Sequence, residues 1–261
     1  MFVLLEEKTV IITGVGGGLG RECVTRALDQ GANVVVAART QETLDSLCAE
    51  LDPDGKRLAA RATDITDAEG CAALVDLAVE RFGSVDALVQ VAAFEYVFGG
   101  LHETDLDTWR QAFDTNVVGA MTLLRPVAKA MEASGGGSVV LIGSQSMFKP
   151  SMPQAGYAAS KGALLTAMYY LADELGAHDI RCNMVVPSWM WGPPVQTYVG
   201  MQAERKGVSE DEALQDIVGD FPLGRMTEDG EVADVVMFFV SDLAKAVTGQ
   251  HLMVNSGELM R

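Results

Sequence analysis

A tyrosine and a lysine four residues apart are the first side chains that could do chemistry together. Tyr157 and Lys161 stand in the run Tyr-Ala-Ala-Ser-Lys. On a helix, residues four apart share a face, so the lysine ammonium can sit near the tyrosine phenol. A free tyrosine has a pKa of about 10, and a nearby cation favours the phenolate. The pair therefore predicts a general acid/base that exchanges a proton near neutral pH.

A glycine-rich run near the start of the chain could hold a phosphate group. Residues 13–20 read Thr-Gly-Val-Gly-Gly-Gly-Leu-Gly and separate a β-branched apolar stretch from a helical pattern. Glycines allow a tight turn and close backbone approach to a diphosphate, whose charge is met by amides at a helix N-terminus. We therefore expect a dinucleotide to bind along this loop, at Gly14, Gly16, Gly17, Gly18, Leu19 and Gly20.

The tip of the second apolar run indicates which dinucleotide binds. An acidic side chain at this point would accept hydrogen bonds from the adenosine ribose, whereas an arginine can pair with a 2′-phosphate. The run ends Val-Ala-Ala-Arg, with Ala38 at the tip and Arg39 directly after it. This arginine favours NADP(H), and NAD(H) stays open as the alternative.

The elements that must position these residues alternate along the chain. Short β-branched runs predict strands at 9–13, 33–37, 57–62, 87–91, 138–142, 181–186 and 251–254. Helical patterns lie between them at 19–30, 41–51, 67–82, 108–132, 156–176 and 231–241. Thr66 and Glu69 have the spacing of a capping box that would begin the third helix. The alternation predicts an α/β fold, a Rossmann-like doubly wound parallel sheet of about seven strands flanked by helices.

The domain organisation follows from length and from one irregular segment. The 261 residues contain no long linker, internal repeat or low-complexity tract, so we expect a single dinucleotide-binding catalytic domain over 1–261. Residues at about 188–220, with two prolines and the acidic run at 210–212, interrupt the alternation of strands and helices. This segment is expected to be a substrate loop or lid.

Charge and composition argue against several partners. The chain carries 36 acidic and 19 basic side chains, a net charge of −17, which repels nucleic acids and anionic membrane surfaces. No apolar run approaches the ~20 residues of a membrane-spanning helix. No export signal is recognised, and the four cysteines form no Cys-x-x-Cys pair, so a cytoplasmic protein with reduced thiols is expected.

Taken together, these motifs resemble the short-chain dehydrogenase/reductase family over essentially the whole chain. The motifs occur in the family's order: the glycine loop at 13–20, Asp64, Asn116, Ser144, Tyr157 with Lys161, and Pro187. The resemblance implies that Tyr157 is the general acid/base and that Ser144 hydrogen-bonds the substrate oxygen. It also implies that Lys161 binds the nicotinamide ribose and tunes the tyrosine, and that Asn116 holds a water linked to the lysine.

The resemblance also implies further contacts and an assembly. Besides the glycine loop and Arg39, the cofactor is expected to contact Asp64, Ile65, Val91, Ala92, Ala93, Tyr157, Lys161, Pro187 and Met190. A homotetramer is implied as well. The chain departs from the family pattern after the fourth strand, where Gln90-Val91-Ala92-Ala93 replaces Asn-Asn-Ala-Gly. The extra methyl of Ala93 stands where backbone could approach the cofactor.

The implied activity is reversible interconversion of a secondary alcohol and a ketone by hydride transfer. Methionine and aromatic residues are expected to line the substrate mouth: Met147, Phe148, Met152, Trp189, Met190 and Trp191. They would form an adaptable apolar pocket for a bulky substrate. The alternative is a non-catalytic NADP(H)-binding sensor on the same fold. The run Gly143-Ser144-Gln145-Ser146 lacks the second glycine of a hydrolase elbow, and no histidine pair has metal-ligand spacing.

Overall fold

One parallel sheet organises the chain. The computed structural model describes residues 3–260, and its seven-stranded sheet has the order β3-β2-β1-β4-β5-β6-β7. The strands are β1 (Thr9–Thr13), β2 (Asn33–Ala38), β3 (Leu58–Ala62), β4 (Ala87–Gln90), β5 (Gly137–Ile142), β6 (Ile180–Pro187) and β7 (His251–Val254). All neighbours pair in parallel. The predicted doubly wound α/β fold is confirmed, and its order reverses between β1 and β4, where such sheets bind ligands.

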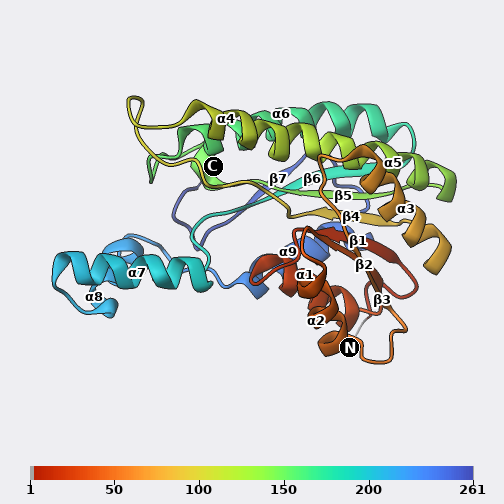
Figure 1. The fold of residues 1–261 in the computed structure, drawn as a ribbon, viewed down its shortest axis with the longest axis horizontal. Coiled ribbons are helices and arrows are strands. Elements are labelled where there is room, and N and C mark those ends of the chain that lie inside the picture. The colour runs from red at the N-terminus through yellow and green to blue at the C-terminus, as the bar shows by residue number, and fades with distance from the viewer. Residues whose placement is uncertain (1–2, 261) are drawn as a thin grey trace.

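Helices cover both faces of the sheet (Figure 1). One face is covered by α1 (Leu19–Asp29), α2 (Gln41–Leu51) and α9 (Asp229–Val240), and the other by α3 (Ala68–Phe82), α5 (Ala120–Ser134) and α6 (Ala155–Gly176). The residues of β1 show how the core divides. Val10 and Ile12 pack with the first layer and Ile11 with the second, and all are 0% exposed, because successive side chains of a strand point to opposite faces.

The helix predicted at 108–132 proves to be three helical segments in one run. It begins with α4 (Leu106–Phe113) and ends with α5. Asp105 caps the N-terminus of α4, and its side chain accepts a hydrogen bond from the Asp107 amide. Between them, residues Asp114–Gly119 form a π-helical segment, η1. Such segments insert an extra residue into the helical turn and are frequent at functional sites, whereas a hydrophobic pattern alone gives no sign of them.

The predicted capping box at Thr66 and Glu69 is wrong. The residue that caps α3 is Asp67, whose carboxylate accepts from the amides of Glu69 and Gly70. The Thr66 hydroxyl instead donates to Asp64 at 2.7 Å. An ionised carboxylate is the stronger acceptor for helix amides, and it stands one residue later.

Residues 193–218 form a helical excursion from the sheet. It consists of α7 (Pro193–Lys206) and α8 (Glu210–Val218), which project beyond the body of the molecule in Figure 1. The two helices pack on each other through a small apolar cluster that includes Val199, Ala203 and Phe221. The segment therefore has its own core beside the two layers of the sheet.

Residues 3–260 show no membrane-spanning helix and no metal-binding cluster. No helix in that range is both long and apolar enough to cross a bilayer. The four cysteines, at 23, 48, 71 and 182, are free thiols. The described residues also contain no cluster of three or more His, Cys, Asp or Glu side chains arranged to hold a metal ion.

Candidate active site

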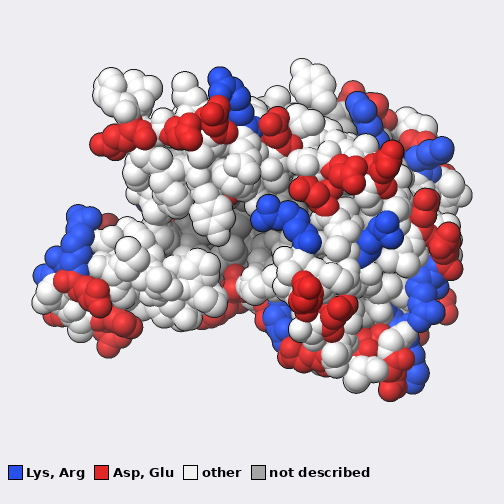
Figure 2. Space-filling view, in the orientation of Figure 1, with Lys and Arg blue, Asp and Glu red and all other residues white. Residues whose placement is uncertain are grey.

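A large cleft lies at the carboxyl edge of the sheet, the edge where the strands end. Its volume is about 1330 Å³, above the roughly 300–1,000 Å³ typical of pockets for drug-sized ligands. Figure 2 shows the surface hollowed beside α7 and α8, with mostly uncharged residues around the hollow. The lining includes these predicted site residues: Gly14, Gly16, Gly17, Gly18, Leu19, Gly20, Arg39, Asp64, Ile65, Val91, Ala92, Ala93, Ser144, Tyr157, Lys161, Pro187 and Met190.

The glycine loop combines tight packing with open space. Gly14 has a φ of 70°, and a Cβ there would lie 2.4 Å from the amide nitrogen of Ala92, so only glycine fits between the ends of β1 and β4. A Cβ on Gly16 or Gly17 would meet nothing within 4 Å. No side chain caps the N-terminus of α1 that follows. Backbone amides at such an uncapped N-terminus can accept an anion.

Arg39 and Asp64 lie on the walls of the cleft, at the ends of neighbouring strands. Both side chains are exposed. Hydrogen bonds from the Thr66 amide and hydroxyl lower the pKa of Asp64, and the charge of Arg39 lowers it further. The arginine is therefore near a permanent carboxylate, but it makes no ion pair with any described residue and keeps its donors for a ligand.

Ser144 and Tyr157 both line the cleft, and their hydroxyls are hydrogen-bonded to each other. Ser144 follows β5 and Tyr157 lies in the first turn of α6. The Ser144 oxygen accepts from the Ser146 hydroxyl at 2.9 Å. Burial raises the pKa of Tyr157 above its ordinary value, Glu95 raises it further, and a hydrogen bond with Ser144 lowers it in part. The expected lowering of this pKa by the lysine is thus wrong in direction, because desolvation of the phenolate dominates.

Lys161 lies next to the Tyr157 ring, as their spacing of four residues on one helix predicts. Its Nζ is 5.7 Å from the centre of the Tyr157 ring and donates to the backbone oxygen of Ile142 at 2.7 Å. The residue is 3% exposed, and burial lowers the pKa of the ammonium to about 8. An ammonium has three donors, so this bond leaves two for other acceptors.

Asn116 lies behind the cleft, in the π-helical segment, and is 1% exposed. Its side-chain oxygen accepts from the Phe94 amide at 2.6 Å, and its nitrogen donates to the Phe94 oxygen and to the Ser160 hydroxyl, both at 2.9 Å. The asparagine therefore joins the loop after β4 to α6. These bonds hold the backbone of the cleft wall, and a water held between Asn116 and Lys161 stays a prediction.

The residues expected at the substrate mouth are only partly brought to the cleft. Met152, Trp189 and Met190 line it, but Met147, Phe148 and Trp191 are absent from the lining. Met147 and Phe148 pack against the core layer of α5 and α6, while Trp191 joins the cluster of α7 and α8. In loops this short, buried and exposed side chains follow no regular period, so the sequence does not show which of them face the cleft.

Several residues of the cleft were not predicted from the sequence. Glu95 stands in the lining and acts electrostatically on both Tyr157 and Lys161. Asp229, at the start of α9, lines the cleft beside the glycine loop. Glu95 follows the fourth strand closely, and its position at a strand end was an available signal. Asp229 is more than 200 residues from the loop it adjoins, so no local pattern could reveal it.

The cleft fits the dinucleotide that the sequence predicts. An open glycine loop, an uncapped helix N-terminus and an arginine without an ion pair lie in the same cleft as Tyr157. The first two suit a diphosphate, and the third suits a 2′-phosphate. A bound nicotinamide would supply or accept a hydride at the tyrosine end.

Comparison with known proteins identifies the family. The chain matches the family described as enoyl-(acyl carrier protein) reductase over residues 14–258. It is 31% identical to L-rhamnose 1-dehydrogenase (NAD(P)(+)) of Azotobacter vinelandii over 260 residues, 98% of each chain. It is 30% identical to dehydrogenase/reductase SDR family member 4 of Oryctolagus cuniculus over 254 residues, 97% of this chain and 94% of the relative.

A solved structure agrees with the sequence relatives. L-Sorbose reductase from Gluconobacter frateurii, complexed with NADPH and L-sorbose, superposes with a TM-score of 0.92 at 25% identity and covers 100% of both chains. The L-rhamnose and L-sorbose relatives are named for a sugar dehydrogenase and a sugar reductase. The chain belongs to the short-chain dehydrogenase/reductase family and is an oxidoreductase that acts on alcohol or ketone substrates with NAD(P).

Proposed function

We propose that the protein interconverts a secondary alcohol and a ketone, with Tyr157 as the general acid/base. The observation that carries this proposal is the meeting of two hydroxyls, from Ser144 and Tyr157, above the buried ammonium of Lys161. In ketone reduction, negative charge develops on the substrate oxygen, so donors aimed at that oxygen lower the barrier. In alcohol oxidation, the same oxygen must lose its proton to a base.

The hydrogen bonds define the task of each hydroxyl. Because Ser146 donates to the Ser144 oxygen, the Ser144 proton is available for the Tyr157 oxygen or for a substrate oxygen. In reduction, Tyr157 gives its proton to the substrate oxygen while Ser144 stabilises that oxygen. The resulting phenolate is then favoured by the Ser144 donor and by the Lys161 cation nearby.

The preferred cofactor in this proposal is NADP(H). Arg39 supports it, since the guanidinium lies at the end of β2, lines the cleft and has no ion-pair partner among the described residues. A 2′-phosphate would give it a bidentate partner. NAD(H) is the alternative, and the nearby Asp64 carboxylate could serve a ribose or adenine group instead.

The proposed substrate is bulky and largely apolar. Aromatic and thioether side chains support this choice: Phe98, Met152, Trp189, Tyr198 and Met201 line the cleft. Trp189 and Tyr198 stack with ring centres 5.4 Å apart, so two aromatic rings pack against each other in the lining. A polyhydroxylated substrate is the second candidate, because Glu95 and Gln154 bring polar groups to the same cleft and two relatives are named for rhamnose and sorbose.

The excursion at about 188–220 is proposed to be a lid on this single catalytic domain. Six residues of α7 line the cleft: Pro193, Pro194, Val195, Thr197, Tyr198 and Met201. Closure of such a segment would exclude water from the reacting oxygen. A homo-oligomer is also proposed, and exposed apolar side chains on the outer helices support it: Leu106, Phe113 and Val118 are 60%, 36% and 57% exposed.

Turnover by a matched pair of tyrosine variants tests the reaction. The purified protein is assayed with NADP⁺ and NADPH against secondary alcohols, ketones and polyols. We expect Tyr157→Phe to lower kcat by about 10²- to 10⁴-fold, the range for loss of a general acid/base. Tyr170→Phe removes a hydroxyl from a residue that is 75% exposed and lies outside the cleft, so it should leave kcat unchanged. Full turnover by Tyr157→Phe would refute the acid/base role.

A further inference from the structure

Asp229 places a carboxylate beside the glycine loop, where the proposed function puts a diphosphate. A Cβ on Gly18 would lie 3.2 Å from Oδ2 of Asp229, and a Cβ on Gly192 would lie 2.9 Å from the same oxygen. Gly18 is the residue before α1, and Gly192 precedes α7. The carboxylate therefore occupies a gap that two glycines leave open between the phosphate loop and the base of the lid.

This carboxylate has no hydrogen-bond partner among residues 3–260. The carboxylates of Asp67, Asp86 and Asp105 all accept bonds from backbone amides, but Asp229 accepts none. It is half-buried in the wall of the cleft. Burying an ionised carboxylate without a partner is unfavourable, so its position calls for an explanation other than stability.

The charged and titratable groups around Asp229 do not neutralise it. Glu22 of α1 and the preceding Glu228 raise its pKa by repulsion, after burial as the main cause. The guanidinium of Arg26 on α1 is engaged by Asp234 at 2.8 Å and by Glu22 at 3.8 Å. On the same two elements, Cys23 is a buried neutral thiol, and Glu231 is held by Arg225.

A diphosphate and an ionised carboxylate in one groove repel each other. Each must lose water as the dinucleotide seats, which strengthens the repulsion. Protonation of the carboxyl removes this repulsion and creates an O–H donor for a phosphate oxygen. The carboxyl already stands among acids that favour its protonated form, so a diphosphate would shift it further in the same direction.

We propose that Asp229 is an affinity-setting residue of the dinucleotide site: its carboxylate opposes the diphosphate, and cofactor binding is coupled to uptake of a proton by this side chain. Dinucleotide affinity then falls as the pH rises through the titration of Asp229. The residue makes cofactor release easier at the phosphate end, away from the Ser144 and Tyr157 hydroxyls. It acts on binding and takes no part in the hydride or proton steps.

Calorimetric titration of the whole protein with NADP⁺ tests the proposal without turnover. Asp229→Asn keeps the shape and removes the charge, and we expect it to bind NADP⁺ about tenfold more tightly at pH 8, equivalent to about one pKa unit of interaction. Asp173→Asn is the matched control, because it removes an equal charge from an exposed site on α6 outside the cleft. It should bind NADP⁺ like the unmodified protein.

Proton uptake gives a second measurement that does not depend on the variant alone. Titrations between pH 5 and 8 in buffers of different ionisation enthalpy count the protons taken up. The 2′-phosphate of NADP⁺ itself titrates near pH 6, but it contributes equally to all three proteins. We expect the uptake in the unmodified protein and in Asp173→Asn to exceed that in Asp229→Asn.

A ligand without a diphosphate localises the effect. Adenosine 2′-monophosphate keeps the group that Arg39 would bind and lacks the diphosphate, so its affinity should be equal in Asp229→Asn and the unmodified protein. Equal NADP⁺ affinity and equal proton uptake in those two proteins would overturn the role of Asp229. An unmodified protein that binds neither NADP⁺ nor NAD⁺ would instead overturn the proposed cofactor site, so the two failures are distinguishable.

Discussion

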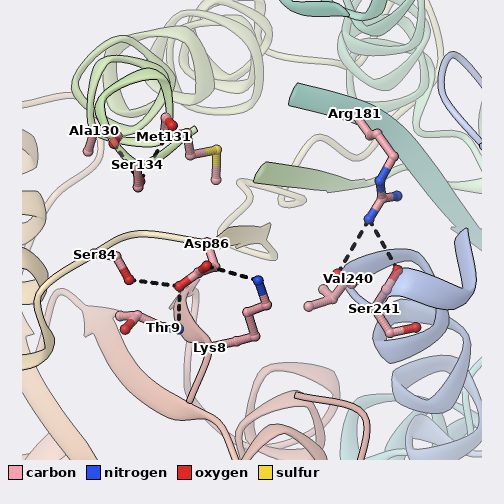
Figure 3. A network of polar contacts seen from close by, with 10 residues as sticks. All are labelled: Lys8, Thr9, Ser84, Asp86, Ala130, Met131, Ser134, Arg181, Val240 and Ser241. Carbon is pink, nitrogen blue, oxygen red and sulfur yellow. Dashed lines mark hydrogen bonds and ion pairs between the residues drawn. The ribbon is translucent and has the colours of Figure 1, made fainter. Parts of the chain in front are cut away.

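The two ends of the same parallel strands use polar side chains in opposite ways. At the amino edge, where the strands begin, Asp86 accepts from the Thr9 amide at 2.9 Å, from Ser84 at 2.8 Å and from Lys8 at 3.2 Å (Figure 3). Arg181 donates to the backbone oxygens of Phe239 and Ser241 at 2.8 and 3.2 Å. These charges are used to join β1, β4 and β6 to the ends of neighbouring elements.

At the carboxyl edge, several polar groups lack such partners. Arg39 has no ion pair, Asp229 accepts no hydrogen bond from a described residue, and the first turn of α1 has no side-chain cap. A second hollow of about 500 Å³ exists at the amino edge, but Lys8, Asp86 and Arg181 in its wall are already bonded. Unsatisfied groups, more than the presence of a hollow, therefore distinguish the edge that binds a ligand.

Replacing Lys161 gives the largest expected effect at the carboxyl edge. Lys161→Met should lower kcat at least about 10²-fold, because the phenolate of Tyr157 loses its nearby cation. The fold should not suffer at neutral pH, since burial has already lowered the pKa of this ammonium from 10.5 to about 8. At about 1.4 kcal/mol per pKa unit, removing the buried charge offsets the lost bond to Ile142.

The pH dependence of the free energy of unfolding tests whether the buried ammonium of Lys161 lowers stability. Between pH 8 and 10.5 the unfolded chain holds a proton that the folded protein has released, so the stability of the unmodified protein rises with pH in that window. The stability of Lys161→Met relative to the unmodified protein should be greatest below pH 8 and decline towards pH 10.5. Lys129→Met, at an exposed position on α5, should show no such trend in urea denaturation.

Replacing Arg181, at the amino edge, should lower the stability of the fold and leave kcat nearly unchanged, the opposite of the result expected for Lys161. Arg181→Met removes a half-buried guanidinium that donates to three consecutive backbone oxygens at the end of α9. Bonds of charged donors contribute about 1.5–3 kcal/mol each, so we expect a loss of about 3 kcal/mol in the free energy of unfolding. The measured kcat should stay within about twofold. A large fall in kcat of the folded variant would contradict the division between the two edges.

The sequence predicts the strands and the glycine loop well because both are local patterns. The observed β1 and β7 have the predicted bounds, β2 to β5 differ by one residue at one end, and β6 is longer by one residue at each end. Tyr157 and Lys161 were also predictable, since four residues on a helix fix their spacing. The direction of the Tyr157 pKa was not, because it depends on how much protein surrounds the phenol in three dimensions.

Contacts between residues that are far apart in the sequence could not be predicted. Asp229 reaches the glycine loop only because α9 packs on α1. Met147 and Trp191 were expected at the substrate mouth but pack into two separate cores, and nothing in their short loops distinguishes an inward from an outward side chain. Local patterns thus locate the elements, whereas long-range packing decides which side chains stay available for a ligand.

Replacing Arg39 tests whether its lack of a partner has a functional reason. Arg39→Gln should weaken NADP⁺ binding about tenfold and change NAD⁺ binding little, because only NADP⁺ carries the 2′-phosphate. Equilibrium titration with both nucleotides measures the ratio. Arg61→Gln, on the exposed end of β3 and outside the cleft lining, makes the same chemical change as a control. Equal weakening of both nucleotides by Arg39→Gln would show that the guanidinium does not read the 2′-phosphate.

Replacing Glu258 has the smallest expected effect on catalysis and tests the comparison between the two edges of the sheet most closely. This carboxylate is a satisfied charge at the carboxyl edge: it accepts from Ser188, after Pro187, and from Lys149 at 3.1 Å, and its side chain is 4% exposed. It therefore ties the loop after β6 to the segment between Ser144 and Tyr157. We infer that it positions both loops around the cleft and touches neither substrate nor cofactor.

The expected result for Glu258→Gln is a roughly threefold rise in KM with kcat nearly unchanged, since an amide keeps one acceptor but loses the charge-assisted bonds. Ser188→Ala breaks the same tie from the other side. If the bond between the two side chains holds the loop, the double variant should have the KM of either single variant, because a lost contact cannot be lost twice. Additive effects on KM would mean that the two residues act separately, and that even a satisfied charge at this edge serves the ligand directly.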